Sequence, residues 1–127
     1  MEGESSSSQD QNSGMLDRAA LLARVEGDME LLLEIVELFL TDSSQQMAQI
    51  RDSVARHDAK ALEEAAHGLK GALGNFAVQA AYDAALRVEM IGQSGDLNQV
   101  EEALMFLEKE VARLKPALET LMKECRI

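Results

Sequence analysis

The sequence predicts an all-α protein, folded as an antiparallel four-helix bundle with a short extra helix at its N-terminal side. The 127 residues are rich in Ala, Leu, Glu and Met and include a single Pro, a mix that favours helices. β-branched residues do not cluster into alternating runs, so strands are not expected. Long amphipathic stretches are joined by short connections, which is typical of antiparallel bundles.

Composition and charge narrow the class of partner and the location. Hydrophobic residues make up 46% and aromatic residues only 3% of the chain, so Ala and aliphatic side chains must build the core. The formal net charge of −11 argues against nucleic acid and against an anionic membrane surface as partners. Cys125 is the single cysteine, which excludes an internal disulfide. With no long apolar run and no signal-peptide pattern, we expect a cytoplasmic protein.

The chain divides into a leader and one domain. Residues 1–14 are Ser, Gly and acidic residues with almost nothing apolar, so we expect a disordered leader or linker. The helical bundle is expected over residues 15–127. Its first helix, 16–25, should stop at Gly27, a residue that suits a helix end. Asp28 is expected to cap the next helix.

The remaining helices follow in order, with one boundary left open. The second begins at residue 29. The weak helix formers at 41–44 either bend this helix or end it, in which case a separate helix follows over residues 45–57. The third, 59–76, is capped by Asp58 and closes near residues 75–78. The fourth spans 80–91 and ends in the turn 92–96. Asp96 and Gln99 are interpreted as a capping box for the last helix, 97–124, which Pro116 should kink or restart.

Apolar spacing predicts which side chains form the core. One face of the second helix holds Leu32, Ile35, Val36 and Phe39. Methionines such as Met47, Met90, Met105 and Met122 are interpreted as core filler. The last helix has apolar residues at spacings of three and four, namely Leu104, Leu107, Val111, Leu114, Leu118 and Leu121.

The segment 63–76, EEAAHGLKGALGNF, contains the residues that point to a chemistry. At about 100° per residue its apolar side chains share one sector of the helix. His67 lies roughly on the side of the helix opposite Leu69 and Phe76, so it should face away from the core. The apolar sector consists of Leu62, Ala65, Leu69, Ala72, Leu73 and Phe76.

The neighbours of His67 on the outer face are a cation and glycines. Lys70, Gly71 and Gly74 share the histidine's face. A glycine inside a helix costs about 1 kcal/mol relative to Ala, yet Gly68, Gly71 and Gly74 fall within eight residues of one another. Missing side chains would let a bulky group approach the imidazole along the helix.

Residue types then predict phosphoryl chemistry. An imidazole has an ordinary pKa of about 6.5, so much of it is uncharged and nucleophilic at neutral pH. A phosphoryl group on its nitrogen carries negative charge, with which the ammonium of Lys70 can pair. A surface nucleophile, a cation and a cleared patch together make a phosphoryl docking site.

These residues resemble the histidine-containing phosphotransfer (HPt) domain of multistep phosphorelays. That family's core pattern is a histidine, a spacer, an aliphatic residue and then Lys-Gly, and the similarity extends over most of residues 15–121. Val78 departs from it, because many relatives have Gly or a small polar residue there. The matching residues are His67-Gly68-Leu69-Lys70-Gly71, Gly74-Asn75-Phe76, Ala81, Ala84, Ala85, Val88-Glu89, Gly92 and Gly95-Asp96-Leu97.

The resemblance implies a function and roles. His67 would accept a phosphoryl group on Nε2 from the aspartate of a receiver domain and pass it to another receiver. Lys70 would stabilise that group, and Gly71 would leave room for the receiver's active site. In the related domain of chemotaxis kinases a Glu on the next helix hydrogen-bonds the histidine, and Glu89 has the matching spacing. Such a bond would fix the tautomer.

It also implies a partner and no cofactor of the chain's own. Receiver domains of response regulators or hybrid sensor kinases would supply Mg²⁺ and the catalytic acids, and the chain would bind no ATP and act as a monomer without kinase activity. No Walker-type or G-x-G-x-x-G motif is present, which agrees with that expectation. The expected docking surface includes Glu63, Glu64, Gly68, Gly71 and Gly74.

Other interpretations remain open at this stage. The chain could be a helical adaptor whose histidine is incidental, or an enzyme with its own kinase or phosphatase activity. Glu64 and His67 form a Glu-x-x-His pair as in di-iron bundles, but His57, the other histidine, has no Glu three residues before it. We therefore expect no metal site. Lys70 could be a solvated lysine that pairs with Glu63, Glu64 or another acid, and Glu89 could be an ordinary surface carboxylate.

Overall fold

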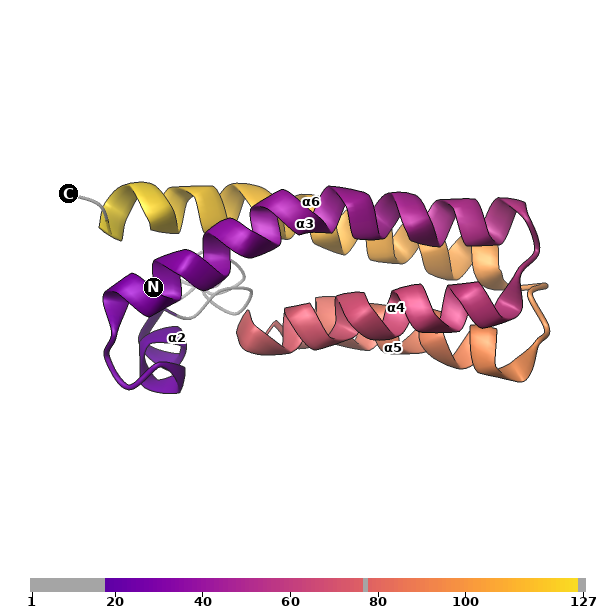
Figure 1. Ribbon diagram of the computed structural model, residues 1–127, viewed down its shortest axis with the longest axis horizontal. Coiled ribbons are helices and arrows are strands. Elements are labelled where there is room, and N and C mark those ends of the chain that lie inside the picture. Colours follow the sequence, from indigo (N-terminus) through magenta and orange to yellow (C-terminus); the bar gives the residue numbers. More distant parts are fainter. Residues whose placement is uncertain (1–17, 77, 126–127) are drawn as a thin grey trace, which may run out of the picture.

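The computed structural model describes residues 18–76 and 78–125, and their helices form an antiparallel bundle (Figure 1). The long helices α3 and α6 lie side by side, the shorter α4 and α5 pack beneath one half of them, and α2 lies beside the start of α3. The predicted fold class is therefore confirmed. The helices are α2 (Arg18–Arg24), α3 (Met29–Ala55), α4 (Ala59–Leu73), the 3₁₀ turn η1 (Gly74–Phe76), α5 (Gln79–Ser94) and α6 (Val100–Cys125). The predicted leader, 1–14, lies outside the described residues.

Each bundle helix buries one stripe of apolar residues, as their spacing predicts. Phe39 of α3 and Phe76 of η1 meet edge to face, with ring centroids 5.2 Å apart, which joins the end of α4 to the middle of α3. Val78 is buried and precedes α5 without a capping side chain. The predicted stripe of α6 is buried along its whole length, at Leu104, Leu107, Val111, Leu114, Leu118 and Leu121.

Helix α3 is continuous through residues 41–44, which settles the boundary that the sequence left open. Its 27 residues pack against α4 and α6. Ser43 is buried at this point, although serine is a weak helix former. Burial against two neighbouring helices stabilises the helix by more than the unfavourable propensity of four residues costs.

Three details of the last two helices differ from the sequence prediction. Helix α5 runs to Ser94 and ends at Gly95, whose φ of 78° is left-handed. The predicted capping box is wrong: α6 begins at Val100, and Asp96 Oδ1 accepts from the amide of Asn98 at 3.0 Å. An aspartate that bonds the backbone two residues on forms a turn instead of a helix cap. Pro116 lies inside α6, so the helix does not restart there, and a kink at Pro116 stays a prediction.

The methionine interpretation holds for half of the set. Met47 is buried and Met122 packs partly against the core. Met90 and Met105, however, are 56% and 69% exposed, so their assignment to the core was wrong. Both lie outside the apolar stripes of their helices, and stripe position decides burial where residue type alone does not.

The N-cap of α4 gives a testable prediction, because Asp58 Oδ1 accepts a hydrogen bond from the amide of Ala61 at 3.0 Å. That backbone hydrogen bond lowers the pKa of Asp58, and the nearby Arg56 cation adds to the effect. The stability that this carboxylate contributes is therefore present above its unfolded pKa, and it is lost as the pH falls through the lower folded pKa. Asp58→Ala should lower the urea midpoint at pH 7, and this difference should shrink in acid, below about pH 4.

The matched control is Asp58→Asn, because asparagine caps helices well and does not titrate. We expect Asp58→Asn to keep most of the stability at pH 7 and to lose the acid dependence. A constant difference between Asp58→Ala and the unchanged chain from pH 7 to pH 2 would contradict the prediction.

Candidate functional site: a histidine, lysine and glutamate across two helices

His67 projects into solvent from the outer side of α4, with 68% of its side chain exposed. Its helix neighbours Ala66 and Leu69 are buried against the rest of the bundle. The outward orientation predicted from the helical periodicity is therefore what the structure shows. An imidazole placed in this way can be reached by a second protein.

Glu89 of α5 holds one nitrogen of this imidazole. Its Oε2 lies 2.9 Å from Nδ1 of His67, and only 9% of the glutamate side chain is exposed. The alternative that Glu89 is an ordinary surface carboxylate is therefore wrong. A nearly buried carboxylate needs partners that offset its desolvation, and His67 is one of two.

Lys70 is the second partner. Its Nζ lies 2.8 Å from Oε1 of Glu89, and only 17% of its side chain is exposed. The expectation that Lys70 pairs with an acid is confirmed, but the acid is Glu89 and neither Glu63 nor Glu64, and the expected solvated position of the lysine was wrong. The buried carboxylate attracts the cation more strongly than exposed carboxylates can, because solvent screens it less.

These contacts favour the ionised forms of Glu89 and Lys70. The contact with Lys70 lowers the pKa of Glu89 against the opposing effect of burial, and the hydrogen bond with His67 lowers it further. The same contact with Glu89 raises the pKa of Lys70, against the lowering effect of desolvation. Because an ionised carboxylate only accepts hydrogen bonds, Nδ1 of His67 carries the hydrogen in this arrangement. The lone pair is then on Nε2, which has no hydrogen-bond partner among the described residues.

Gly92 brings the two helices close enough for this contact. A Cβ built on Gly92 would lie 2.7 Å from the amide nitrogen of Glu63 and 2.9 Å from the carbonyl oxygen of Ala59. Only a residue without a side chain allows the backbones of α4 and α5 to approach so closely. Gly92 lies one turn from Glu89 and was expected to belong to a turn. Its signal in the sequence was a glycine in register with the buried positions Ala85, Val88 and Glu89.

The other predicted docking residues lie around His67 in different surroundings. A Cβ on Gly71 would meet nothing within 4 Å, whereas one on Gly68 would lie 3.8 Å from Nε2 of Gln46 on α3. Gly74 has left the α-helix for η1 and faces the ring of Tyr82. Glu64 is exposed beside Lys60, and Glu63 is partly buried. The open surface next to the imidazole is therefore at Gly71, where no side chain blocks the approach of a partner.

The described part of the chain lacks two further features. It contains no cluster of His, Cys, Asp or Glu residues with the size that a metal site needs. None of its helices combines the length and apolar character that crossing a bilayer requires.

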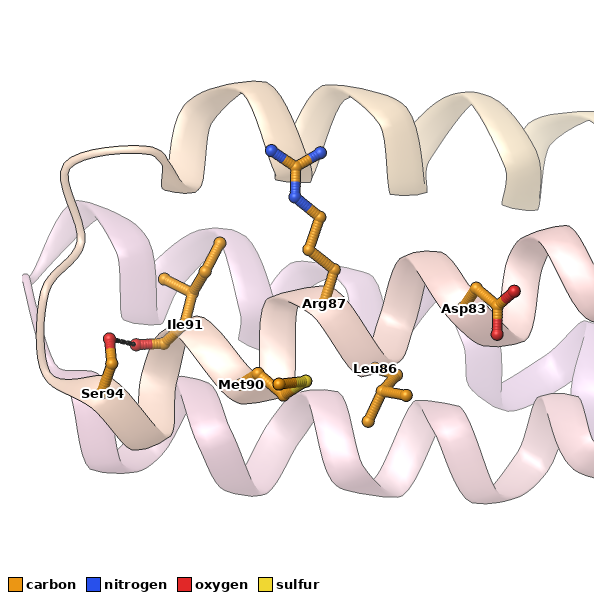
Figure 2. Close-up of a pocket in the computed structure, with 6 residues that line it drawn as sticks. All are labelled: Asp83, Leu86, Arg87, Met90, Ile91 and Ser94. Carbon is orange, nitrogen blue, oxygen red and sulfur yellow. Dashed lines mark hydrogen bonds between the residues drawn. The ribbon is translucent and has the colours of Figure 1, made fainter.

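A hollow of about 380 Å³ lies beside α5 (Figure 2). Arg87 points from it toward α6, where Nη2 lies 3.7 Å from Oε1 of Glu102. The hollow is lined by Asp83, Leu86, Arg87, Met90, Ile91 and Ser94, all from α5.

Comparison with known protein families gives a match to the Hpt domain over residues 34–117. The chain belongs to the Hpt domain family. The match covers α4 and α5 with the whole histidine, lysine and glutamate group. Hpt domains carry phosphoryl groups in phosphorelays and interact there with receiver domains, so this chain is a phosphorelay phosphocarrier.

Solved structures share the fold of this Hpt domain. Histidine-containing phosphotransfer protein B (HptB) from Pseudomonas aeruginosa PAO1 aligns with a TM-score of 0.80 and 20% identity, over 87% of this chain and 96% of that one. The HPT domain from the Hpt sensor hybrid histidine kinase from Shewanella aligns with a TM-score of 0.77 and 16% identity, over the same shares. No curated protein sequence matches the chain.

The open surroundings of Gly71 give a prediction for this Hpt domain. Gly71→Glu should slow phosphotransfer from a receiver by about tenfold or more, because the new side chain occupies the approach to His67. It should also stabilise the helix by about 0.5–1 kcal/mol, since glycine is a poor helix former and nothing clashes. Initial rates of phosphotransfer from a labelled receiver and urea unfolding measure the two effects. Thr120→Glu, on an exposed turn of α6, is the matched control, and equal transfer rates in both variants would refute the access argument.

Proposed function

We propose that His67 is the phosphoacceptor of this phosphocarrier and that its Nε2 is the reacting atom. The observation that supports this most directly is the contact between Nδ1 and the buried Glu89. It leaves the lone pair on the exposed nitrogen and holds the ring in one orientation. His67 combines solvent exposure with a carboxylate that orients it, as a phosphoacceptor requires.

The proposed step is an in-line phosphoryl transfer between two side chains. The Nε2 lone pair forms the new N–P bond while the P–O bond to the receiver's aspartate breaks, and the aspartate leaves as a carboxylate with the electron pair. The hydrogen on Nδ1 stays between that nitrogen and Glu89, which offsets the positive charge that develops on the ring. The reverse step returns the phosphoryl group to another receiver's aspartate.

We assign the remaining chemistry to the partner. A receiver domain of a response regulator or hybrid sensor kinase supplies Mg²⁺ and its acidic residues, whereas this chain supplies the nucleophile, its orientation and the open approach at Gly71. Under this proposal the chain has no kinase activity of its own, binds its partners transiently as a monomer, and acts in the cytoplasm.

Phosphotransfer profiling tests the proposal. The chain is mixed with a panel of receiver domains that have been labelled with radioactive acetyl phosphate. We expect label to move to the chain from at least one receiver and to be lost in acid but retained in alkali, as a phosphoramidate bond requires. Label incorporated from ATP and Mg²⁺ without any partner would overturn the assignment as a carrier.

Removal of the cation gives a further prediction. Lys70→Ala should slow phosphotransfer by about tenfold without abolishing it, because Lys70 assists the reacting groups by a charge-assisted contact and is not the nucleophile. Initial transfer rates from a phosphorylated receiver measure this. Lys60→Ala, which removes an exposed lysine of the same helix, should leave the rate unchanged. Complete loss of transfer in a folded Lys70→Ala chain would contradict this division of roles.

A further inference from the structure

The ring of Tyr82 lies across the last turn of α4. The Nζ atom of Lys70 is 5.9 Å from the centroid of this ring. A Cβ built on Gly74 would lie 3.7 Å from Cε2 of the same ring, an ordinary contact distance. Lys70 and Gly74 are four residues apart, so they lie one above the other on the helix. The half-buried tyrosine therefore spans the distance between them.

Lys70 is held between two groups of α5. Tyr82 and Glu89 are seven residues apart on that helix, which places them on one face about two turns apart. The ammonium contacts the ring on one side and Oε1 of Glu89, at 2.8 Å, on the other. A lysine has a flexible four-carbon stem and a strongly hydrated charge, so a side chain without such a neighbour would spend much of its time in water.

We propose that Tyr82 is a positioning residue for phosphotransfer, because its ring keeps the ammonium of Lys70 on Glu89. The attraction is that of a cation for the face of an aromatic ring. Through this contact Tyr82 acts on the carboxylate that orients His67. The inference rests on the proposed role of His67 and goes beyond it, because it assigns a function to a residue that touches neither the imidazole nor the phosphoryl group.

The geometry separates the ring from its hydroxyl. Within the described ranges no hydrogen bond is recorded for the hydroxyl of Tyr82, whereas the ring makes the contacts with Lys70 and Gly74. Tyr82→Phe should therefore preserve the function, because phenylalanine keeps the aromatic face. Tyr82→Leu fills a similar space with an apolar side chain but has no aromatic face to attract the cation.

The test uses potassium phosphoramidate as a small phosphoryl donor, so that receiver docking does not enter the rate. The donor's P–N bond breaks, ammonia leaves after taking a proton from water, and Nε2 of His67 forms the new bond to phosphorus. We expect Tyr82→Phe to react within about twofold of the unchanged chain, and Tyr82→Leu to react about three- to tenfold more slowly. Phe106→Leu, which makes the same kind of change at an exposed aromatic residue of α6, should react like the unchanged chain.

A double-mutant cycle distinguishes positioning from a structural role. Lys70→Met removes the charge on which Tyr82 is inferred to act, so adding Tyr82→Leu to it should slow the reaction no further. If Tyr82→Leu slows the reaction by the same factor with and without Lys70, the ring acts through the fold and the inference is wrong. The same holds if Tyr82→Phe is as slow as Tyr82→Leu.

A second readout does not depend on rate. The ¹⁵N shifts of the His67 ring report which nitrogen carries the hydrogen. Tyr82→Leu should alter them, Tyr82→Phe should not, and unaltered shifts in Tyr82→Leu would oppose the inference. His67→Gln provides the blank: if that variant takes up phosphoryl as fast as the unchanged chain, the proposed function fails, whereas an inert His67→Gln with an additive cycle removes only the role of Tyr82.

Discussion

His67→Gln should abolish phosphotransfer while the fold and the affinity for receiver domains remain. A glutamine amide approximates the size and polarity of the imidazole but has no nucleophilic lone pair on nitrogen, so an N–P bond cannot form. With 68% of the His67 side chain exposed, the substitution removes little packing, and the free energy of unfolding should change by less than about 0.5 kcal/mol. Label transfer from a phosphorylated receiver, receiver binding by calorimetry and urea unfolding measure the three quantities.

His57→Gln is the matched control for that experiment. His57 is the other histidine of the chain, in the connection between α3 and α4 with a left-handed φ of 55°. Glutamine is strained there in the same way as histidine, since neither is glycine, and transfer should be unchanged. If label still moves to His67→Gln and no longer moves to His57→Gln, the phosphoacceptor is His57 and our proposal is wrong.

Gly92→Ala should give the largest loss of stability among the glycine substitutions. Its Cβ would lie 2.7 Å from the amide nitrogen of Glu63 and 2.9 Å from the carbonyl oxygen of Ala59. Both are backbone atoms of α4, so the helices must move apart instead of a side chain turning aside. We expect a net loss of about 1–3 kcal/mol in the free energy of unfolding, although alanine favours the helix by itself. Phosphotransfer should also slow, because Glu89 lies one turn away.

Gly71→Ala is the control, because it makes the same change on the other helix where a Cβ meets nothing within 4 Å. It should raise the free energy of unfolding by about 0.5–1 kcal/mol. Urea unfolding of both variants measures the contrast. If Gly92→Ala proves as stable as Gly71→Ala, the close approach of α4 and α5 does not constrain the bundle as the structure indicates.

Local signals in the sequence were sufficient where they agreed with the burial pattern. Asp28 and Asp58 cap α3 and α4 through the side-chain bonds that their positions predict. The apolar stripe of α6 is buried throughout. Where a local signal was the only guide it failed: Asp96 and Gln99 matched a capping box, yet Asp96 bonds Asn98 in a turn. Several local structures satisfy the same short pattern, and the packing of the helices selects among them.

In the candidate site, too, some features could be predicted from the order of residues along one helix and others could not. Periodicity placed His67 on the outer face of its helix, because that inference needs only the direction of the core. An acidic partner for Lys70 was expected, but the spacing along α4 indicates Glu63 and Glu64 and cannot identify a carboxylate on another helix. Tyr82 was not singled out, and Gly92 was matched to the family but assigned to a turn, since each matters through an atom of α4 that it approaches. The roles of His67, Lys70 and Glu89 in transfer stay predictions for the experiments above.

By itself the sequence determined the helices, the face of each that is buried, and the exposed histidine beside a glycine, because these follow from the order of residues along one helix. The tertiary structure decided what the histidine contacts. Glu89 reaches the imidazole, and Lys70 reaches Glu89, only because two helices approach closely at Gly92. Distances between helices depend on packing across the whole bundle, which no periodicity within a single helix can specify.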